Sequence, residues 1–342
     1  MNQTKRKLFA ACVGATVAVS IGIPGAYAQA KYVAKVGHLE QATQPRHKGL
    51  EKVAQLVTER TKGEVEFKLF PASQLGNARQ MMEGVQFGTI EATVMPAAFI
   101  GGFNPAISVL DIPYLFPTDR GTAQQLRDGL FGKALLDSFA ARGFTPIALW
   151  PNGRKSLTSN KALDSIEAMR GQKFRVMDSR ILIEQFSAVG ASAVAIQFGE
   201  LYTALQTGVI DGQENPLDTI STMKFHEVQK NLVVTEHGAM EDVVLFNPGF
   251  WGKLPAGHRT LIINAFNEVR PEVEKNKEEA QAAALGIIRG AKVNVRVADE
   301  AERKKLRDAM FPRARAAYLE RAGAEGERLL KLYEDERRKL AF

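Results

Sequence analysis

Three polar side chains lie at or near the ends of predicted strands, where they could contact a charged ligand. Arg154 follows a strand predicted over 144–150, and Arg175 lies within an otherwise apolar strand. Asn215 follows a strand predicted over 208–211. The planar guanidinium of arginine presents paired N–H donors that match both oxygens of a carboxylate, which the single ammonium of lysine does not. These residues therefore predict capture of an organic anion.

The same residues have structural explanations that stay open at this point. An unpaired charge in an apolar strand is costly, so Arg175 needs a partner, and Asp178 could supply it. Asn215 precedes Pro216, which disfavours helical backbone before it and itself favours a first helical turn, so Asn215 could cap a helix. An amide at a helix start could equally donate to a bound carboxylate, because exposed backbone N–H groups favour anions there.

The sequence lacks the common catalytic motifs. It has no Gly-x-Ser-x-Gly elbow, no His-Glu-x-x-His, no Walker-type loop and no Gly-x-Gly-x-x-Gly fingerprint. Its five histidines share no metal-ligand spacing, and its single cysteine is Cys12. We therefore predict a protein that is not an enzyme and that binds neither a cofactor nor a metal. An exported hydrolase with an unrecognised site is the less favoured alternative.

Residues 1–28 have the three parts of a secretory signal peptide. A basic start at 5–7 precedes an apolar segment at 8–23, and Ala-Tyr-Ala at 26–28 forms a cleavage site. The apolar segment is shorter than the roughly 18 residues of a spanning helix. We predict cleavage, which removes Cys12, and export to the periplasm.

Charge is balanced along the rest of the chain. The formal net charge is +7, and three of these charges belong to the signal peptide, which leaves about +4. Lysine and arginine alternate with acidic residues, as in 334–338, so no basic stripe indicates nucleic acid binding. No further apolar segment could span a membrane, so we predict that the mature chain is not membrane-embedded and binds no nucleic acid.

Strand and helix patterns alternate along the chain, which favours a parallel sheet with helices on its faces. An almost unbroken helical pattern over 255–288 predicts one long helix or two abutting helices. We expect two α/β lobes with several crossings between them. The other predicted strands are 31–37, 64–70, 90–95, 173–177 and 243–246, and the other predicted helices are 45–61, 78–87, 131–142, 179–189, 198–206 and 299–342.

Four segments resemble, in order, motifs of the DctP-type substrate-binding proteins of TRAP transporters. They are Phe-Pro-Ala-Ser-Gln-Leu-Gly at 70–76, Asn-Gly-Arg-Lys at 152–155, Arg-Gly-Gln-Lys-Phe-Arg-Val at 170–176, and the run from Gly199 to Pro216 that ends in Gly-Gln-Glu-Asn-Pro. The similarity spans essentially the whole mature chain. It implies a two-lobed, periplasmic-binding-protein-like (Venus flytrap) α/β fold with a long interdomain helix.

We expect lobe I to comprise residues 29–151 plus about 241–280. Lobe II would comprise 152–240 plus about 281–342.

The resemblance also implies a set of ligand contacts. Arg175 would make the main paired contact with a substrate carboxylate, Asn215 would support it, and Phe198 would pack against the ligand. Another arginine is expected in a Gly-x-Arg motif after the fourth strand. Strict spacing places Lys155 there, with Arg154 one residue earlier, and we favour Arg154.

One wall of the expected site departs from a known subtype. Sialic-acid-binding members carry a glutamate after the third strand, where this chain has Pro96. Met95 and Phe99 make this wall apolar, which suits a smaller or less hydroxylated acid. Weaker candidates for ligand contact are Trp150, Glu40, Gln44, Met177 and His237, and His237 could instead serve a hinge.

We therefore predict a monomeric solute-binding protein that captures a small organic acid by clamshell closure. Dicarboxylates, oxo acids, sugar acids and aromatic acids all carry the carboxylate that Arg175 would hold. Closure requires the ligand to bind the closed state more tightly than the open one. The expected partner is the permease of an ion-gradient-driven TRAP transporter. A periplasmic sensor that feeds a kinase or chemoreceptor is the alternative.

Overall fold

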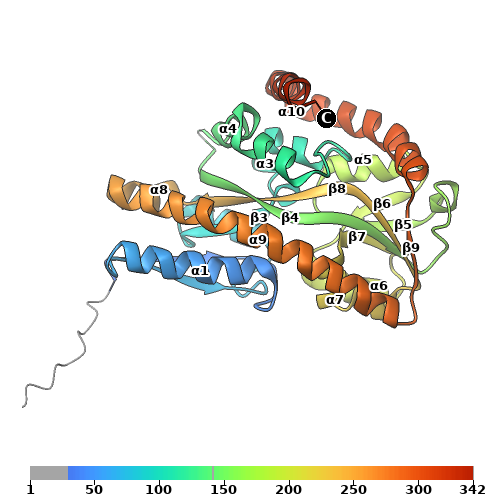
Figure 1. Cartoon of the computed structure of the whole chain (residues 1–342), viewed down its shortest axis with the longest axis horizontal. Helices are drawn as coiled ribbons and strands as arrows, with labels where there is room; N and C mark the ends of the chain where they lie inside the picture. The colour runs from blue at the N-terminus through green and yellow to red at the C-terminus, as the bar shows by residue number, and fades with distance from the viewer. Residues whose placement is uncertain (1–29, 141, 342) are drawn as a thin grey trace, which may run out of the picture.

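The computed structural model describes residues 30–140 and 142–341, and within them one nine-stranded sheet forms the centre of an α/β protein (Figure 1). The predicted signal peptide, residues 1–28, lies outside the described residues. The strand order is β2-β1-β3-β8-β4-β7-β5-β6, and β9 pairs with β8. The strands are β1 (Tyr32–Gly37), β2 (Val65–Phe70), β3 (Ala92–Pro96), β4 (Thr145–Ser159), β5 (Lys173–Val176), β6 (Ser192–Ala195), β7 (Gly212–Pro216), β8 (Asn231–Phe246) and β9 (Asn294–Val297).

Helices cover both faces of this sheet. In Figure 1, α1 and α9 run along one face, while α3, α4, α5 and α10 lie on the other. The α-helices are α1 (Pro45–Arg60), α2 (Ala78–Phe87), α3 (Arg120–Asp128), α4 (Leu130–Asp137), α5 (Arg180–Ser187), α6 (Leu201–Gln206), α7 (Leu217–Thr222), α8 (Pro248–Lys253), α9 (Ala256–Gly290) and α10 (Glu300–Leu340). Short 3-10 helices are η1 (Ala97–Phe99), η2 (Pro105–Asp111), η3 (Glu167–Met169), η4 (Phe198–Glu200) and η5 (Phe225–Val228).

Two long strands join the halves of the sheet and give the two-lobed arrangement. Residues 145–151 of β4 pair with 241–246 of β8 beside β3, and residues 154–159 pair with 231–239 beside β7. The pairing is irregular at the crossing, where Gly153 adopts φ of +96°, a conformation that glycine takes readily. The lobe boundaries remain a prediction.

The sheet is mixed, so the prediction of a parallel sheet was incomplete. Pairs within each half are parallel, as in β1–β2, β1–β3, β5–β6 and β5–β7. Three pairs that involve the crossing strands, β3–β8, β4–β7 and β4–β8, are antiparallel, while β9 pairs with β8 in parallel. The reason is that β4 carries the chain from the first half to the second and β8 carries it back, so the two strands run in opposite directions.

Helix α9 is the predicted long helix that spans both halves. Its first part buries Phe266 and Val273 against the first half of the sheet and α1. Its second part buries Ala284 and Ile288 against the second half and α7. Proline at position 271 lies inside this helix. The helix therefore connects two separate hydrophobic cores through one rigid element.

Helix α10 closes the opposite face. Gly323 interrupts its helical backbone with φ of +57° and ψ of −143°, so the helix bends back on itself. Leu306, Tyr318 and Leu329 on either side of the bend pack into the third core, which is shared by both halves. None of the helices within 30–140 and 142–341 combines the length and the apolar character that crossing a bilayer requires.

One predicted strand was placed wrongly. Residues 208–211 form a turn, and the strand β7 begins only at Gly212. Asn215 is therefore the penultimate residue of a buried strand and not the cap of a helix, since α7 starts after Pro216. Polar side chains hid this strand, since Gln213 and Asn215 are buried and bond to each other.

Candidate functional site

A small cavity lies between the two halves of the protein. It encloses about 290 Å³ of space that atoms do not fill, part of which opens to solvent. Its walls come from the segments after β1 and β3, from the start of α1, from the crossing strands, and from the ends of β5 and β7. The lining residues are Leu39, Glu40, Arg46, Pro96, Phe99, Asn152, Met177, Phe198, Asn215, Thr219 and Met240.

Apolar side chains form a large part of this lining. Phe99 stands in the turn that directly follows β3, and Pro96 ends that strand. Phe198 and Met177 face them from the second half, after β6 and β5. Met95 belongs to the hydrophobic core and does not line the cavity. Binding pockets for small molecules commonly combine apolar walls of this kind with a few polar groups that orient the ligand.

Arg175 is fully buried on β5 close to this cavity. Its Nε donates to the carbonyl oxygen of Ile196 at 2.9 Å, which fixes the side chain. Its two terminal nitrogens have no hydrogen-bond partner among the described residues, and it makes no ion pair there. The predicted partner Asp178 does not pair with it. Burial lowers the pKa of Arg175 to about 10, and Glu214 opposes this, so the guanidinium stays charged at neutral pH.

Neighbours of Arg175 in the chain and in the sheet line the cavity. Arg175 is on β5, two residues before Met177. Ile196, whose carbonyl oxygen accepts from Arg175, lies two residues before Phe198. In the β5–β7 register Arg175 stands opposite Gln213, whose side-chain oxygen accepts from Asn215 Nδ2 at 2.5 Å. The structure therefore places Asn215 and Phe198 on the cavity and Arg175 on the neighbouring strand, although Arg175 itself is not a lining residue.

One end of the cavity carries a buried charged cluster, of which the sequence analysis named only Glu40. Arg46, near the start of α1, contacts Asp242 on β8 through Nε at 2.7 Å and Nη2 at 2.6 Å. Its Nη2 also lies 3.6 Å from Glu40, and Asn152 Nδ2 donates to Asp242 at 3.1 Å. Arg46 was hidden because an arginine in an amphipathic helix usually lies in solvent. Only its fully buried environment singles it out.

Lys277 of α9 connects this cluster to the second half. Its Nζ lies 2.8 Å from Glu40 and 2.8 Å from Asp218 at the start of α7. All three side chains are buried. Burial would raise the pKa of Glu40, but Arg46 and Lys277 lower it to about 2, so Glu40 is ionised. One lysine thus bridges an acid from each half.

Lys155 and His237 lie on the other face of the sheet, away from the cavity. Lys155 Nζ contacts Glu214 at 2.7 Å, and His237 Nε2 contacts the second oxygen of the same carboxylate at 2.7 Å. Gln185 also donates to Glu214, at 2.5 Å. Neither candidate lines the cavity, because side chains alternate along β4 and β7 and these residues face α5.

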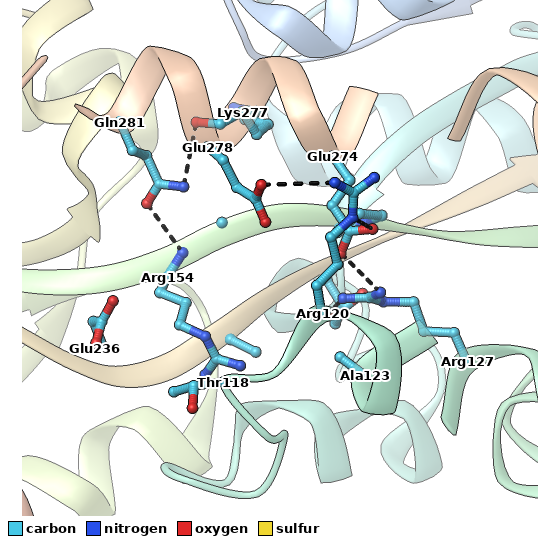
Figure 2. Close-up of a pocket in the computed structure, with 14 residues that line it drawn as sticks. Thr118, Arg120, Ala123, Arg127, Arg154, Glu236, Glu274, Lys277, Glu278 and Gln281 are labelled. Atoms are coloured by element: carbon cyan, nitrogen blue, oxygen red, sulfur yellow. Dashed lines mark hydrogen bonds and ion pairs between the residues drawn. The ribbon is translucent and has the colours of Figure 1, made fainter. Parts of the chain in front are cut away.

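Arg154 lies in a second pocket, of about 170 Å³, behind the crossing strands. Figure 2 shows its side chain directed towards Thr118, between β4 and the helices that cover it. Its guanidinium donates to the carbonyl oxygens of Phe116 and Pro117, and its backbone N–H to Gln281 of α9. The structure therefore does not bring Arg154 to the first cavity.

The second pocket is lined by an ion-pair network between α3, β8 and α9 (Figure 2). Arg127 makes two bonds to Glu241, at 2.8 and 2.9 Å, and reaches Glu274 at 3.2 Å. Arg120 contacts the other oxygen of Glu274 at 3.0 Å. Arg120 and Arg127 are thus paired with acids, whereas Arg154 in the same pocket bonds to carbonyl oxygens.

Two further candidates lie outside the cavity lining. Trp150 is fully buried against Phe266, to whose carbonyl oxygen its Nε1 donates at 3.1 Å. Gln44 is the residue before α1, and its side-chain oxygen accepts from the Gln41 backbone at 2.9 Å. Neither lines the cavity. Over residues 30–140 and 142–341, no three His, Cys, Asp or Glu side chains are grouped to hold a metal.

Comparison with known proteins shows which family shares these features. The family model for bacterial extracellular solute-binding protein, family 7 (DctP) matches residues 36–321. The C4-dicarboxylate-binding periplasmic protein DctP of Rhodobacter capsulatus is 33% identical over 290 residues, which are 84% of this chain and 86% of that protein. The 2,3-diketo-L-gulonate-binding periplasmic protein YiaO of Escherichia coli K12 is 32% identical over 302 residues, covering 88% and 91%.

Solved structures share the fold closely. A TRAP periplasmic solute-binding protein from Desulfovibrio salexigens with bound orotic acid is 63% identical, with a TM-score of 0.90 over 90% of this chain and 99% of that chain. Another, from Sulfurospirillum deleyianum with bound succinate, is 31% identical, with a TM-score of 0.81 over 90% and 99%. These similarities confirm the predicted two-lobed binding-protein fold.

Proposed function

The chain belongs to the bacterial extracellular solute-binding protein family 7, and on that premise we propose that it captures a small organic acid through Arg175 for a TRAP transporter. The observation that carries this proposal is the buried guanidinium of Arg175, whose terminal N–H groups have no hydrogen-bond partner among the described residues. A charge in that position is costly alone. A carboxylate that accepts both N–H groups removes this cost.

The ligand we propose is a flat, ring-bearing acid of the orotic acid type. Phe99, Phe198 and Met177 offer broad apolar contact on the two sides of the cavity. The protein that is 63% identical holds orotic acid. Pro96 stands where sialic-acid-binding relatives carry a glutamate, so this position offers no carboxylate to the hydroxyl groups of a sugar acid.

Capture would proceed by closure of the two halves around the ligand. Arg175 and Asn215 stand on one half, while Phe99, Glu40 and Arg46 stand on the other. A ligand that touches both groups binds the closed form more tightly, so it shifts the population towards closure. The closed protein would act in the periplasm, where the curated relatives are placed, and would deliver the acid unchanged to the membrane permease.

The proposal is tested by titrating the mature protein with orotate and with orotamide in a calorimeter and in a thermal-shift assay. A ligand that binds the folded state raises the melting temperature by mass action. We expect a shift with the acid and none with the amide, and recovery of unchanged orotate after incubation. Equal binding of acid and amide would overturn the role of Arg175, and conversion of orotate would overturn the assignment as a binding protein.

A further inference from the structure

One end of the cavity presents polar atoms that are held in place but left without a hydrogen-bond partner. Glu40, Arg46 and Asn152 all line this end, and each is buried. Within residues 30–140 and 142–341, no hydrogen bond reaches Glu40 Oε2, Arg46 Nη1 or Asn152 Oδ1. Buried polar groups in folded proteins nearly always have partners. Three such atoms around one cavity therefore indicate ligand contacts.

The chemical identity of each of these atoms is fixed by the bond that its side chain already makes. Asn152 donates its Nδ2 to the carboxylate of Asp242 at 3.1 Å, so the remaining atom must be the amide oxygen. Glu40 accepts from Lys277 through Oε1 at 2.8 Å, which leaves Oε2 as an acceptor. Arg46 is held by Asp242 through Nε and Nη2, and its remaining Nη1 can only donate.

The second half of the protein adds a fourth polar group to this end of the cavity. Thr219, in the first turn of α7, also lines the cavity, and its hydroxyl has no hydrogen-bond partner in the described part of the chain. A hydroxyl both donates and accepts. The ligand would therefore meet one fixed donor, two fixed acceptors and one group that can do either.

The charge balance at this end opposes a second carboxylate. Arg46 and Lys277 are countered by Glu40, Asp242 and Asp218, all within one connected set of ion pairs. Glu40, whose free oxygen lines the cavity, is held ionised, with its pKa lowered to about 2 by Arg46 and Lys277 against the effect of burial. A carboxylate placed beside that oxygen would meet like charge, which disfavours binding.

We propose that Glu40, Arg46 and Asn152 form hydrogen bonds to the adjacent N–H and C=O groups of a neutral ring, which we call its amide edge. They would so select a cyclic amide or imide that carries one carboxylate over a dicarboxylate. This rests on the proposed function, in which Arg175 holds the carboxylate. A ring N–H would donate to Glu40 or Asn152, and a ring carbonyl would accept from Arg46 or Thr219. Adjacent N–H and C=O groups at the rim of one flat ring match this alternation of acceptors and donors.

Calorimetry with four probes tests the selectivity in the wild-type protein. Orotate carries both the carboxylate and the amide edge, pyrimidine-4-carboxylate carries only the carboxylate, uracil carries only the edge, and succinate carries two carboxylates. Loss of one hydrogen bond to an ionised buried partner and one to a neutral buried partner should weaken binding by roughly 2 to 3 kcal/mol, which is about 30- to 150-fold in affinity. We expect orotate to bind more tightly than pyrimidine-4-carboxylate and succinate by at least about 30-fold.

A matched pair of variants assigns this selectivity to Glu40. E40Q keeps the shape of the side chain and an oxygen for Lys277, but places an N–H donor where the free acceptor was. D218N alters the other acid on Lys277, also at 2.8 Å, and Asp218 does not line the cavity. We expect E40Q to reduce the preference for orotate over pyrimidine-4-carboxylate about tenfold or more, and D218N to retain it.

The outcomes separate this inference from the proposed function. If no carboxylate probe binds, the proposed function fails and the inference fails with it. If the carboxylates bind but orotate gains nothing over pyrimidine-4-carboxylate or succinate, only the inference is overturned. The wild-type comparison decides this even if E40Q does not fold. A folded E40Q that keeps the full preference would also overturn the role of Glu40.

Discussion

Replacement of Arg175 by methionine should remove most of the affinity for a carboxylate ligand. Methionine has about the length of the arginine stem and no charge, so the packing of β5 is largely kept. The loss would comprise the two terminal N–H groups, which are buried and have no other hydrogen-bond partner in the described residues. Two charge-assisted hydrogen bonds in such a place are worth roughly 2 to 4 kcal/mol, or about 30- to 1,000-fold in the dissociation constant.

The same substitution, R175M, should leave the stability of the ligand-free protein unchanged or raise it. In the ligand-free protein Arg175 is a buried charge whose single hydrogen bond goes from Nε to Ile196. Removal of a buried charge that lacks an ion-pair partner is often neutral or stabilising. We therefore expect the melting temperature of ligand-free R175M to equal or exceed that of the wild type, while the orotate-induced shift disappears. If Arg175 served only to stabilise the fold, R175M would instead have a lower melting temperature than the wild type.

Isothermal titration of R175M, R175K and R154M with orotate decides between the two arginines. R175K should also bind weakly, because an ammonium cannot make the paired contact. R154M should keep the wild-type affinity, since the guanidinium of Arg154 bonds to Phe116 and Pro117 outside the cavity. A larger loss in R154M than in R175M would refute this reasoning, and so would wild-type affinity in R175M.

Three further predictions concern stability. Lys277→Met should destabilise the protein by about 3 kcal/mol or more in urea unfolding, because Glu40 and Asp218 would stay buried without their shared cation; an unchanged transition would show that these acids are satisfied without it. Asp111, whose pKa burial raises to about 7 although Lys155 and Ser179 lower it, binds a proton between about pH 4 and pH 7 in the folded state but not when unfolded. Wild-type stability should therefore fall by a few kcal/mol as pH rises through that window, relative to D111N, and parallel pH profiles of the two melting temperatures would contradict this. Gly49→Ala places a methyl group 2.2 Å from Val273, so it should separate α1 from α9 and cost about 1 to 3 kcal/mol, whereas G252A meets no atom within 4 Å and should be nearly neutral in the same unfolding assay.

Much of the fold was predictable because the elements carry strong local signals. Helix α2 has the predicted bounds, and its start is set by a capping box between Asn77 and Gln80. Helix α9 extends over 256–290, close to the predicted 255–288, because few breakers interrupt its pattern. The crossing strands were predicted only in part, as 144–150 and 243–246. Strand β4 continues past a proline and polar residues into the second half, and β8 begins there with charged and polar residues among its apolar ones.

The site was predictable where a motif places a residue, and not where distant segments meet. Arg175, Asn215 and Phe198 do gather near one cavity, and their roles as ligand contacts remain predictions. Spacing could not decide between Arg154 and Lys155. The irregular pairing around Gly153 sends Arg154 towards the loop at 116–117 and Lys155 towards Glu214.

The sequence alone determined the α/β class, the long helix and the family, because repeated patterns and long motifs are properties of contiguous residues. The tertiary structure alone decided which charges are neutralised. Arg46, Asp242, Glu40 and Lys277 come from four separate segments and pair only after folding. Arg175 is left with unsatisfied donors for the same reason: burial and the positions of partners are set by packing between segments far apart in the chain.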